Sequence, residues 1–325
     1  MRPLEEIVEA IREARSIALV SHVNPDGDTV GSALALKLGL DKLGKQTAMF
    51  CEDKVPDRIL FLKGAETYRR PEEASPERFD LLVCVDVADE GRMGSCAALM
   101  ARCGHIAQID HHGTNPNYAE INCVDAQSPA TALIAWEVLE RLGVAVDVDM
   151  AACLYVGIST DTGDFAYNNT TPEAFRVTGD LLAAGLPLSK INRRLYRQRE
   201  VAQVLLLQRA LSTLTFYHNG EITSMTLTQQ DFADCGALPE HADTLVNYGI
   251  DIEGVRLTVL ARETCVPGEV KLSMRAVEPD SVCEVAKSFG GGGHQQASGA
   301  TVCGPLAECV ARCVAAFEAS LEKRK

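Results

Sequence analysis

Short runs of branched apolar residues alternate with helix-patterned segments through the first half of the chain, and this alternation limits the fold more than any other feature. Runs of this length and composition predict buried strands at Ile17–Ser21, Thr47–Cys51, Leu81–Val85 and Ile106–Ile109. The segments between and after them predict helices at Thr29–Leu43, Ser128–Leu142, Met150–Ser159 and Pro172–Ala184. Strands that alternate with helices favour an α/β fold with a mostly parallel sheet flanked by helices on both faces.

The pattern changes in the second half, where strand-like segments follow one another closely. They predict strands at Ile222–Leu227, Val255–Arg262 and Val270–Arg275, and helices at Val282–Ser288 and Leu306–Leu321. Between the halves, Leu188–Leu211 is helix-patterned without glycine or internal proline, which predicts a linker helix. We therefore expect a first domain at 1–187, the linker at 188–211 and a smaller α/β domain with a mixed sheet at 212–325.

Charge and composition narrow the class of partner. The formal net charge of −14 disfavours binding to long duplex nucleic acid, because such binding neutralises many phosphates. No apolar run reaches the ~18 residues of a membrane span. The N-terminus is charged and helix-patterned, unlike a secretory signal. The 12 cysteines are scattered without a CxxC pair, as expected of reduced thiols. We expect a cytoplasmic protein without a membrane partner.

Side chains of the metal-binding type follow several of the predicted strands and one helix. They are His22, Asp26 and Asp28, then Asp86, then Asp110, His111 and His112, and finally Asp161 and Asp164. Each group alone also fits a turn or a helix cap, as PDG at 25–27 does. Together they would meet at one edge of a parallel sheet, where a divalent cation would offset their repulsion.

The number and type of these side chains indicate which ion and which chemistry. More than four ligands suggest two ions, and mixed carboxylate and imidazole ligands suit Mn²⁺, with Mg²⁺ as the alternative. Two metals about 3.5–4 Å apart are the usual arrangement for in-line displacement at phosphorus. The chain contains neither GxSxG nor a P-loop, so no serine nucleophile or nucleotide-binding loop of those kinds is expected.

A run of four glycines at 290–293 precedes His294. Its ordinary interpretation is a flexible hinge. The alternative is an anion site, since successive glycines let backbone N–H groups curl around a negative charge, and His294 can add a donor.

Five motifs, in order along nearly the whole chain, resemble the DHH phosphoesterases. They are SHVNPDGDTVGS from Ser21, CVD at Cys84–Asp86, DHH at Asp110–His112, STDTGDF at Ser159–Phe165 and GGGGHQQASGA at Gly290–Ala300. The last is similar to the glycine-rich signature of the accompanying DHHA1 domain. Within the family, the chain most resembles the bacterial oligoribonucleases (nanoRNases) that are also pAp phosphatases. Thr29 departs from the small or aliphatic residue that usually follows the second aspartate.

The resemblance implies a role for each candidate residue. One Mn²⁺ would be held by His22, Asp26 and Asp86, and the other by Asp28, Asp86, His111 and Asp161, with Asp86 bridging. His112 would face the scissile phosphate as charge stabiliser or proton donor, and Asp110 would orient a neighbouring histidine. The substrate's terminal phosphate would be gripped by Arg275, Gly291, Gly292, Gly293 and His294. Asp164 has no implied ligand role.

The implied activity is Mn²⁺-dependent hydrolysis of short oligoribonucleotides and of pAp, with water activated between two metals. A phosphodiesterase for pApA, the linear product of a cyclic dinucleotide, is the alternative with the same chemistry. A nucleotide-binding protein without catalysis is the alternative of a different class. The resemblance leaves open whether the chain forms a homodimer. Four linker arginines, at 193, 194, 197 and 199, fit an exposed helix face and are candidates for aiding substrate binding.

Overall fold

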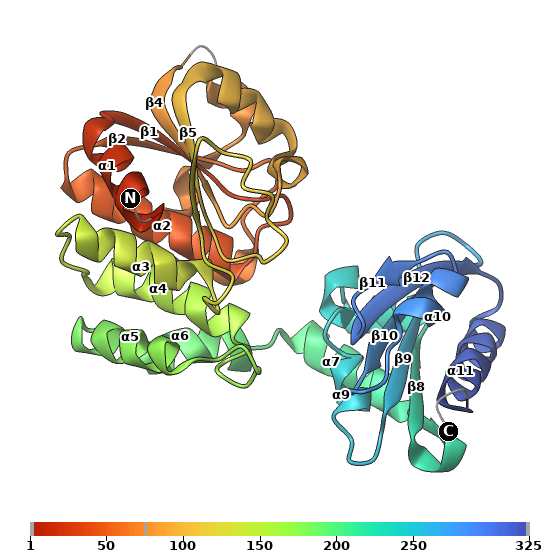
Figure 1. The fold of residues 1–325 in the computed structure, drawn as a ribbon. Coiled ribbons are helices and arrows are strands. Elements are labelled where there is room, and N and C mark those ends of the chain that lie inside the picture. The colour runs from red at the N-terminus through yellow and green to blue at the C-terminus, as the bar shows by residue number, and fades with distance from the viewer. Residues whose placement is uncertain (1–2, 75–76, 323–325) are drawn as a thin grey trace. The chain divides into compact units, whose positions relative to one another are not determined.

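The computed structural model describes residues 3–74 and 77–322, so the ends of the predicted domain ranges, residues 1–2 and 323–325, lie outside the described residues. The chain forms two compact units, Met1–Gln198 and Arg199–Lys325 (Figure 1). Among the described residues, no helix combines the length and the apolar character needed to cross a bilayer. All of the twelve cysteines are free thiols.

Unit 1 is built on a six-stranded sheet in which every pairing is parallel, in the order β3-β2-β1-β4-β5-β6. The strands are β1 (Ser16–Val20), β2 (Gln46–Phe50), β3 (Tyr68–Arg69), β4 (Phe79–Val85), β5 (Cys103–Asp110) and β6 (Ile121–Val124). The α-helices are α1 (Pro3–Glu13), α2 (Gly27–Lys42), α3 (Thr131–Arg141), α4 (Val148–Asp161), α5 (Pro172–Ala183) and α6 (Leu188–Asn192). The 3₁₀ helices are η1 (Asp57–Ile59), η2 (Ala65–Thr67), η3 (Pro71–Ala74) and η4 (Glu90–Arg102), and η5 (Arg193–Arg197) is a π-helix.

Both faces of this sheet are covered, as the sequence predicts. The larger core lies between one face and helices α1 to α5, and includes Ile17, Leu34 and Leu154. The smaller core lies under η4 on the other face, where Met93 and Leu99 pack on strand residues. The predicted α/β class and its mostly parallel sheet are confirmed, and each predicted element is present with its ends shifted by a few residues.

The continuous linker helix is wrong. The α-helix α6 ends at Asn192, the π-helix η5 follows, and the chain is extended at Gln198 and Glu200 before α7 (Val201–Ser212) begins. Residues 198–200 are polar and exposed, so burial of an apolar face contributes little to helix formation there. The boundary between the two units falls at this break.

Unit 2 contains a mixed sheet in the order β11-β12-β10-β9-β8-β7, in which only the β8–β9 pair is parallel. Its strands are β7 (Thr215–Tyr217), β8 (Ile222–Leu227), β9 (Leu257–Glu263), β10 (Glu269–Ala276), β11 (Gly292–Gly293) and β12 (Ala297–Cys303). Its other helices are α8 (Gln229–Cys235), α9 (Asn247–Ile250), α10 (Cys283–Ser288) and α11 (Leu306–Glu322), with the 3₁₀ turns η6 (His218–Gly220) and η7 (Pro239–Ala242). One core lies under α10 and α11, and a second includes residues of α7 and α8.

Candidate metal centre

The turn between β1 and α2 carries the first candidate ligands because Asp26 caps the helix. Its Oδ1 accepts hydrogen bonds from the backbone N–H groups of Asp28 and Thr29, at 3.0 and 3.2 Å. Oδ2 remains directed to His22, whose Nε2 lies 3.6 Å away. Asp26 can therefore cap the helix with one carboxylate oxygen and bind a metal with the other.

Close packing of α2 on α4 brings Asp28 toward Asp161, the last residue of α4. A Cβ added at Gly157 would lie 2.6 Å from the Ala132 Cβ and 2.7 Å from Asp28 Oδ1. A Cβ at Gly31 would collide with the Cys153 carbonyl. Glycine at these two positions lets the helices approach closely enough to place both carboxylates at one edge of the sheet.

Asp86 follows β4 with φ at 62°, in the left-handed region that a residue with a Cβ rarely adopts. Its N–H donates to the Ile109 carbonyl, and its Oδ1 accepts from the Thr131 hydroxyl at 2.8 Å. Such backbone strain persists where the surroundings hold it, and it clusters at functional sites. Here it directs a carboxylate that is only 2% exposed between two groups of candidate ligands.

Two groups of three side chains can each hold one cation, and Asp86 lies close to both. His22, Asp26 and Asp86 form one group, in which His22 Nε2 lies 3.6 Å from Asp86 Oδ2. Asp28, His111 and Asp161 form the other. His111 Nε2 lies 3.1 Å from Asp161 Oδ2 and 3.6 Å from Asp86 Oδ1. The structure thus brings together all six side chains that the sequence nominated as ligands.

Both histidines of these groups present Nε2 to the carboxylates. Nδ1 of His111 lies 3.1 Å from the Ser128 carbonyl, and Nδ1 of His22 lies 2.8 Å from the Val23 carbonyl. A carbonyl only accepts, so Nδ1 carries a proton, and Nε2 is the nitrogen that would bind a metal after losing its proton.

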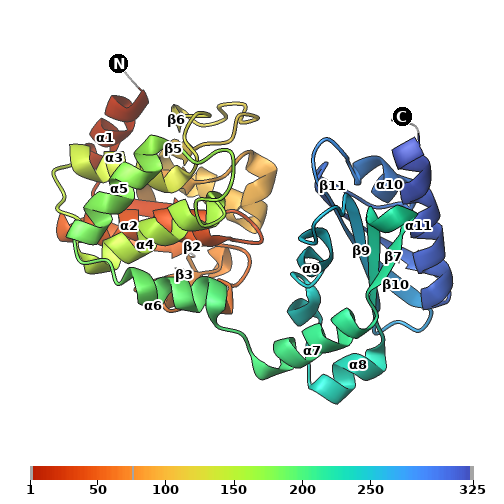
Figure 2. The same cartoon turned by 90° about the horizontal axis from the view of Figure 1, so that it is seen from below.

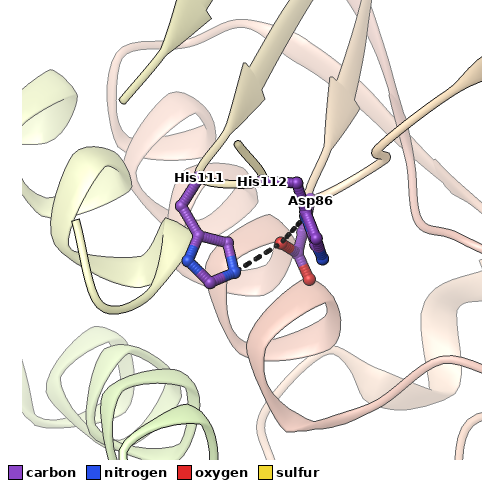
Figure 3. Close-up of side chains that lie close together, drawn as sticks. All are labelled: Asp86, His111 and His112. Carbon is purple, nitrogen blue, oxygen red and sulfur yellow. Dashed lines mark ion pairs between the residues drawn. The ribbon is translucent and has the colours of Figure 1, made fainter. Parts of the chain in front are cut away.

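His112 lies beside the two groups and has a different partner. Its Nδ1 is 2.8 Å from Asp110 Oδ1 and 3.6 Å from Asp86 Oδ1. Figure 3 shows the Asp86 carboxylate between the His111 and His112 side chains, with both ion pairs dashed. Asp110 is fully buried, and its Oδ2 accepts from Asn115 at 2.5 Å. Together with Asp86 and His111, His112 also forms a third group that could hold a cation.

Comparison with known proteins agrees with this geometry. Residues 16–158 match the model of the DHH family, N-terminal domain. Over 305 residues the chain is 35% identical to the bifunctional oligoribonuclease and PAP phosphatase NrnA of Thermus thermophilus. The matched residues cover 94% of this chain and 89% of that protein. The chain belongs to the DHH family. It is accordingly a hydrolase of the DHH phosphoesterase type.

Two further relatives cover almost the whole chain. The bifunctional oligoribonuclease and PAP phosphatase NrnA of Bacillus subtilis is 25% identical over 307 residues, covering 91% of this chain and 92% of that protein. The crystal structure of an exopolyphosphatase-related protein from Bacteroides fragilis superposes with a TM-score of 0.87 at 26% identity, covering 99% and 96% of the two chains. The likeness to these proteins therefore extends through both units.

The electrostatics of the DHH site favour a bound cation. Burial and the neighbouring Asp86 and Asp161 raise the pKa of Asp28 well above its ordinary value. Burial lowers the pKa of His111, but its contact with Asp161 and the charges of Asp28 and Asp86 outweigh burial and raise it to about 10. Both shifts favour bound protons on Asp28 and His111. A divalent cation would replace these protons, and the oxygen and imidazole donors fit such an ion.

Sequence reasoning missed the residues that support the ligands. Thr131 holds Asp86, and Thr29, the departure from the family turn, donates its hydroxyl hydrogen to the Val85 carbonyl at 2.7 Å. Arg92, on η4, places Nη2 3.0 Å from Nδ1 of His22. Neither Thr131 nor Arg92 follows a predicted strand directly. Only the position of Arg92 shortly after Asp86 could have suggested it.

Asp28 has a second structural task that its sequence position does not reveal. Helix α3 has Ala130 at its N-cap, without a side-chain cap. Asp28 replaces this cap from α2, since its oxygens accept from Thr131 N at 2.6 Å and Ala132 N at 2.9 Å. Ser32 Oγ adds a third hydrogen bond at 2.9 Å. The negative charge also lies at the positive end of the helix dipole.

The remaining predicted site residues lie in unit 2 and at the end of α4. Gly292 and Gly293 form β11, and a Cβ at Gly291 would collide with the Gly299 carbonyl, so close strand packing itself requires glycine there. Arg275 pairs in register with Ala297, whose carbonyl accepts the His294 N–H, so Arg275 and His294 share one end of the sheet. Asp164 accepts from the Ser159 hydroxyl at 3.4 Å, outside all three groups.

Proposed function

We propose that this DHH protein hydrolyses short oligoribonucleotides to mononucleotides and removes the 3′-phosphate of pAp. One observation carries the proposal: two groups of ligand-type side chains meet at Asp86 in a chain that is 35% identical to a bifunctional oligoribonuclease and PAP phosphatase. Paired metal sites are suited to displacement at phosphorus. Substrates of this size are compatible with a net charge of −14, because the site needs to reverse the sign only locally.

The proposed cofactor is a pair of Mn²⁺ ions. One would be held by His22, Asp26 and Asp86, and the other by Asp28, Asp86, His111 and Asp161. When bound, two such ions lower the pKa of a water molecule and offset charge on the phosphoryl oxygens. The carbonyls of Val23 and Ser128 hold the two imidazoles in the orientation that ligation requires.

His112 is the proposed proton donor to the leaving oxygen, and Asp110 is its positioning residue. The contact with Asp110 raises the pKa of His112 above its ordinary value, which favours the protonated ring that a proton donor requires. Asp110 is held in turn by Asn115, so the ring cannot easily rotate away from its partner. Donation from Nε2 would leave the Nδ1 hydrogen bond to Asp110 intact.

Arg92 is the proposed contact to a non-bridging phosphate oxygen. A guanidinium can only donate, so it cannot hydrogen bond to a His22 Nδ1 that already carries a proton. The same ring state that frees Nε2 for a metal therefore leaves Nη2 of Arg92 in need of an acceptor. Among the residues of the described ranges, no carboxylate lies within ion-pair distance of Arg92, and a phosphate oxygen would supply the acceptor.

Unit 2 is proposed to bind the terminal nucleotide of the substrate. Arg275 would donate to its phosphate, with Gly291, Gly292, Gly293 and His294 adding backbone and imidazole donors. The support is that Arg275 and His294 lie at the same end of the sheet. A guanidinium and a glycine-lined backbone are both suited to an anion.

A side-by-side assay tests the proposal. Purified protein is incubated with pAp, pApA and a five-nucleotide RNA, with Mn²⁺ and with a chelator. We expect turnover of pAp and RNA with Mn²⁺ and none after chelation. Unchanged turnover in chelator would refute the metal mechanism. Turnover of pApA alone would replace the proposed substrates with the linear dinucleotide, and nucleotide binding without turnover would indicate a binding protein.

A further inference from the structure

A group of cationic side chains on α6 and η5 is not used by the site described above. Lys190, Arg193, Arg194 and Arg197, here called the basic strip, are all exposed. No carboxylate in the described part of the chain lies within ion-pair distance of any of the four. Asp149, which lines one hollow together with Lys190 and Arg194, is paired with Lys63 at 2.5 Å. In a protein of net charge −14, four neighbouring cations without an anionic partner call for an explanation.

The basic strip runs alongside the helix that carries Asp161. The Tyr155 hydroxyl donates to Asn192 Oδ1 at 2.6 Å, and the hydroxyls of Ser159 and Tyr196 lie 2.7 Å apart. The later residue of α4 contacts the later residue of the α6–η5 segment, so α6 and η5 run in the same direction as α4 (Figure 2). The strip therefore leads toward the end of α4, where the candidate metal centre lies.

Local packing holds the strip in place. The guanidinium of Arg194 lies over the Phe61 ring, 4.6 Å from its centroid. Tyr196 is anchored by Ser159, and its neighbours lie in the π-helix η5, a form often found at functional sites. At the far end of the strip, Lys190 and Arg194 line a hollow of about 260 Å³ together with Phe61 and Ala152.

The length of the strip corresponds to several nucleotides. From Ala152 at the hollow to Asp161 at the metal centre, α4 spans about 14 Å at about 1.5 Å per residue. Stacked nucleotides of one strand rise about 3.4 Å each. A single strand with one end at the metal centre would therefore extend over about four nucleotides before passing the hollow.

We propose that the basic strip binds the phosphodiester backbone of single-stranded RNA beyond the nucleotide that is cleaved. The inference rests on the proposed function, because it places the reacting phosphate at the metal centre. Guanidinium groups match phosphate geometry and release counterions on binding. The site thereby favours RNA of several nucleotides over a dinucleotide, which reaches only the end of the strip nearest the metal centre. Arg199, the other arginine of the sequence cluster, begins unit 2 and is not included.

The test compares the variant R193Q/R194Q/R197Q with the unchanged protein. In the presence of Mn²⁺, we expect KM for a five-nucleotide RNA to rise at least about tenfold, KM for a dinucleotide to rise much less, and kcat for both substrates to stay unchanged. In chelator, fluorescence anisotropy of the same RNA measures binding without cleavage. Losing three phosphate contacts should reduce the slope of log K against log salt by about 2.

Two control variants make the result specific. R12Q/R141Q/R176Q removes the same charge from α1, α3 and α5, and should leave the preference for the longer RNA intact. R193K/R194K/R197K keeps the charge and should retain most of the salt dependence. The far-ultraviolet circular dichroism of each variant verifies its fold.

The outcomes separate this inference from the proposed function. Equal rises in KM for both lengths, or an unchanged salt slope, would overturn the strip as a binding site for RNA. Absence of turnover in the unchanged protein would overturn the proposed function. The anisotropy series would then still decide whether the strip binds single-stranded RNA.

Discussion

The two units differ in what surrounds their buried carboxylates. In unit 2, the nearly buried Asp280 accepts two hydrogen bonds from Arg256, and the guanidinium also bonds Glu221 at 2.8 Å. In unit 1, Asp28 and Asp86 are buried among further carboxylates, and burial with these neighbours raises the pKa of Asp28. Unit 2 pairs this buried carboxylate with a guanidinium of its own chain, whereas unit 1 gathers several carboxylates at one sheet edge. This difference indicates which unit requires an external cation.

Replacing Asp86 by alanine should have the largest effect, because this carboxylate lies close to both groups of ligands. We expect the rate of hydrolysis to fall at least about 10³-fold, since metal ions contribute several kcal/mol of charge stabilisation and 1.36 kcal/mol corresponds to a factor of ten. The measurement is turnover of a dinucleotide with Mn²⁺, together with the amount of Mn²⁺ bound. D149N, at an exposed ion pair of the same unit, is the control. Activity retained in D86A would disprove the ligand assignment.

Adding Mn²⁺ should stabilise unit 1 and leave unit 2 unchanged. The chain has one tryptophan, Trp136 on α3, so its fluorescence reports the unfolding of unit 1. At a metal concentration about 100 times the Kd, we expect about 2.7 kcal/mol of stabilisation in that signal. A shift of the same size with Mg²⁺ would change the preferred ion. No shift with any divalent cation would contradict the contrast between the units.

The arginines of the two units should respond in opposite ways to the same substitution. R92Q removes a cation that has no carboxylate partner in the described ranges, so kcat/KM should fall about 10- to 100-fold with little change in stability. R256Q leaves Asp280 without two of its hydrogen bonds and should destabilise unit 2 by about 3 kcal/mol without changing kcat. Denaturant unfolding measures the stability of both variants, and steady-state kinetics measures their kcat and KM. Reduced stability in R92Q with normal kinetics would make Arg92 a structural residue.

Two substitutions of Asp28 should distinguish its role as a helix cap from its proposed role as a metal ligand. D28A removes the acceptor of the first N–H groups of α3, and we expect unit 1 to lose about 1–3 kcal/mol in the tryptophan signal. D28N keeps one acceptor oxygen and should lose less stability, while its affinity for the second metal ion falls. Equal stability of the two variants would show that the trans cap contributes little.

Local pattern predicted much of the fold because strands and helices depend on residues close in sequence. Runs such as Leu81–Val85 are apolar throughout, as strands buried on both faces require, and β4 is found there. The linker was less predictable, since the helical periodicity of 188–211 continues through the polar residues at 198–200. These residues are exposed, and the helix is broken there, which periodicity does not reveal.

For the candidate site too, the sequence predicts one part and only the structure shows the other. Its ligand types follow from the sequence, because parallel strands bring the residues after them to one edge. The supporting contacts do not: Thr131 is distant in sequence from Asp86, and its hydroxyl reaches that carboxylate only because α3 lies against the sheet edge. The glycine run shows the converse, since part of it forms β11 and is required by close strand packing as well as by any role toward an anion.

The amino-acid sequence by itself determined the order of the elements, the two-part organisation and the identity of the side chains that converge on one edge. These properties depend on short-range periodicity and on the geometry of parallel strands. Tertiary structure alone decided the left-handed backbone of Asp86, the capping of α3 by Asp28 and the alignment of the basic strip with α4. Each of these joins residues far apart in the chain or holds a conformation against its local preference, and only packing supplies the energy for that.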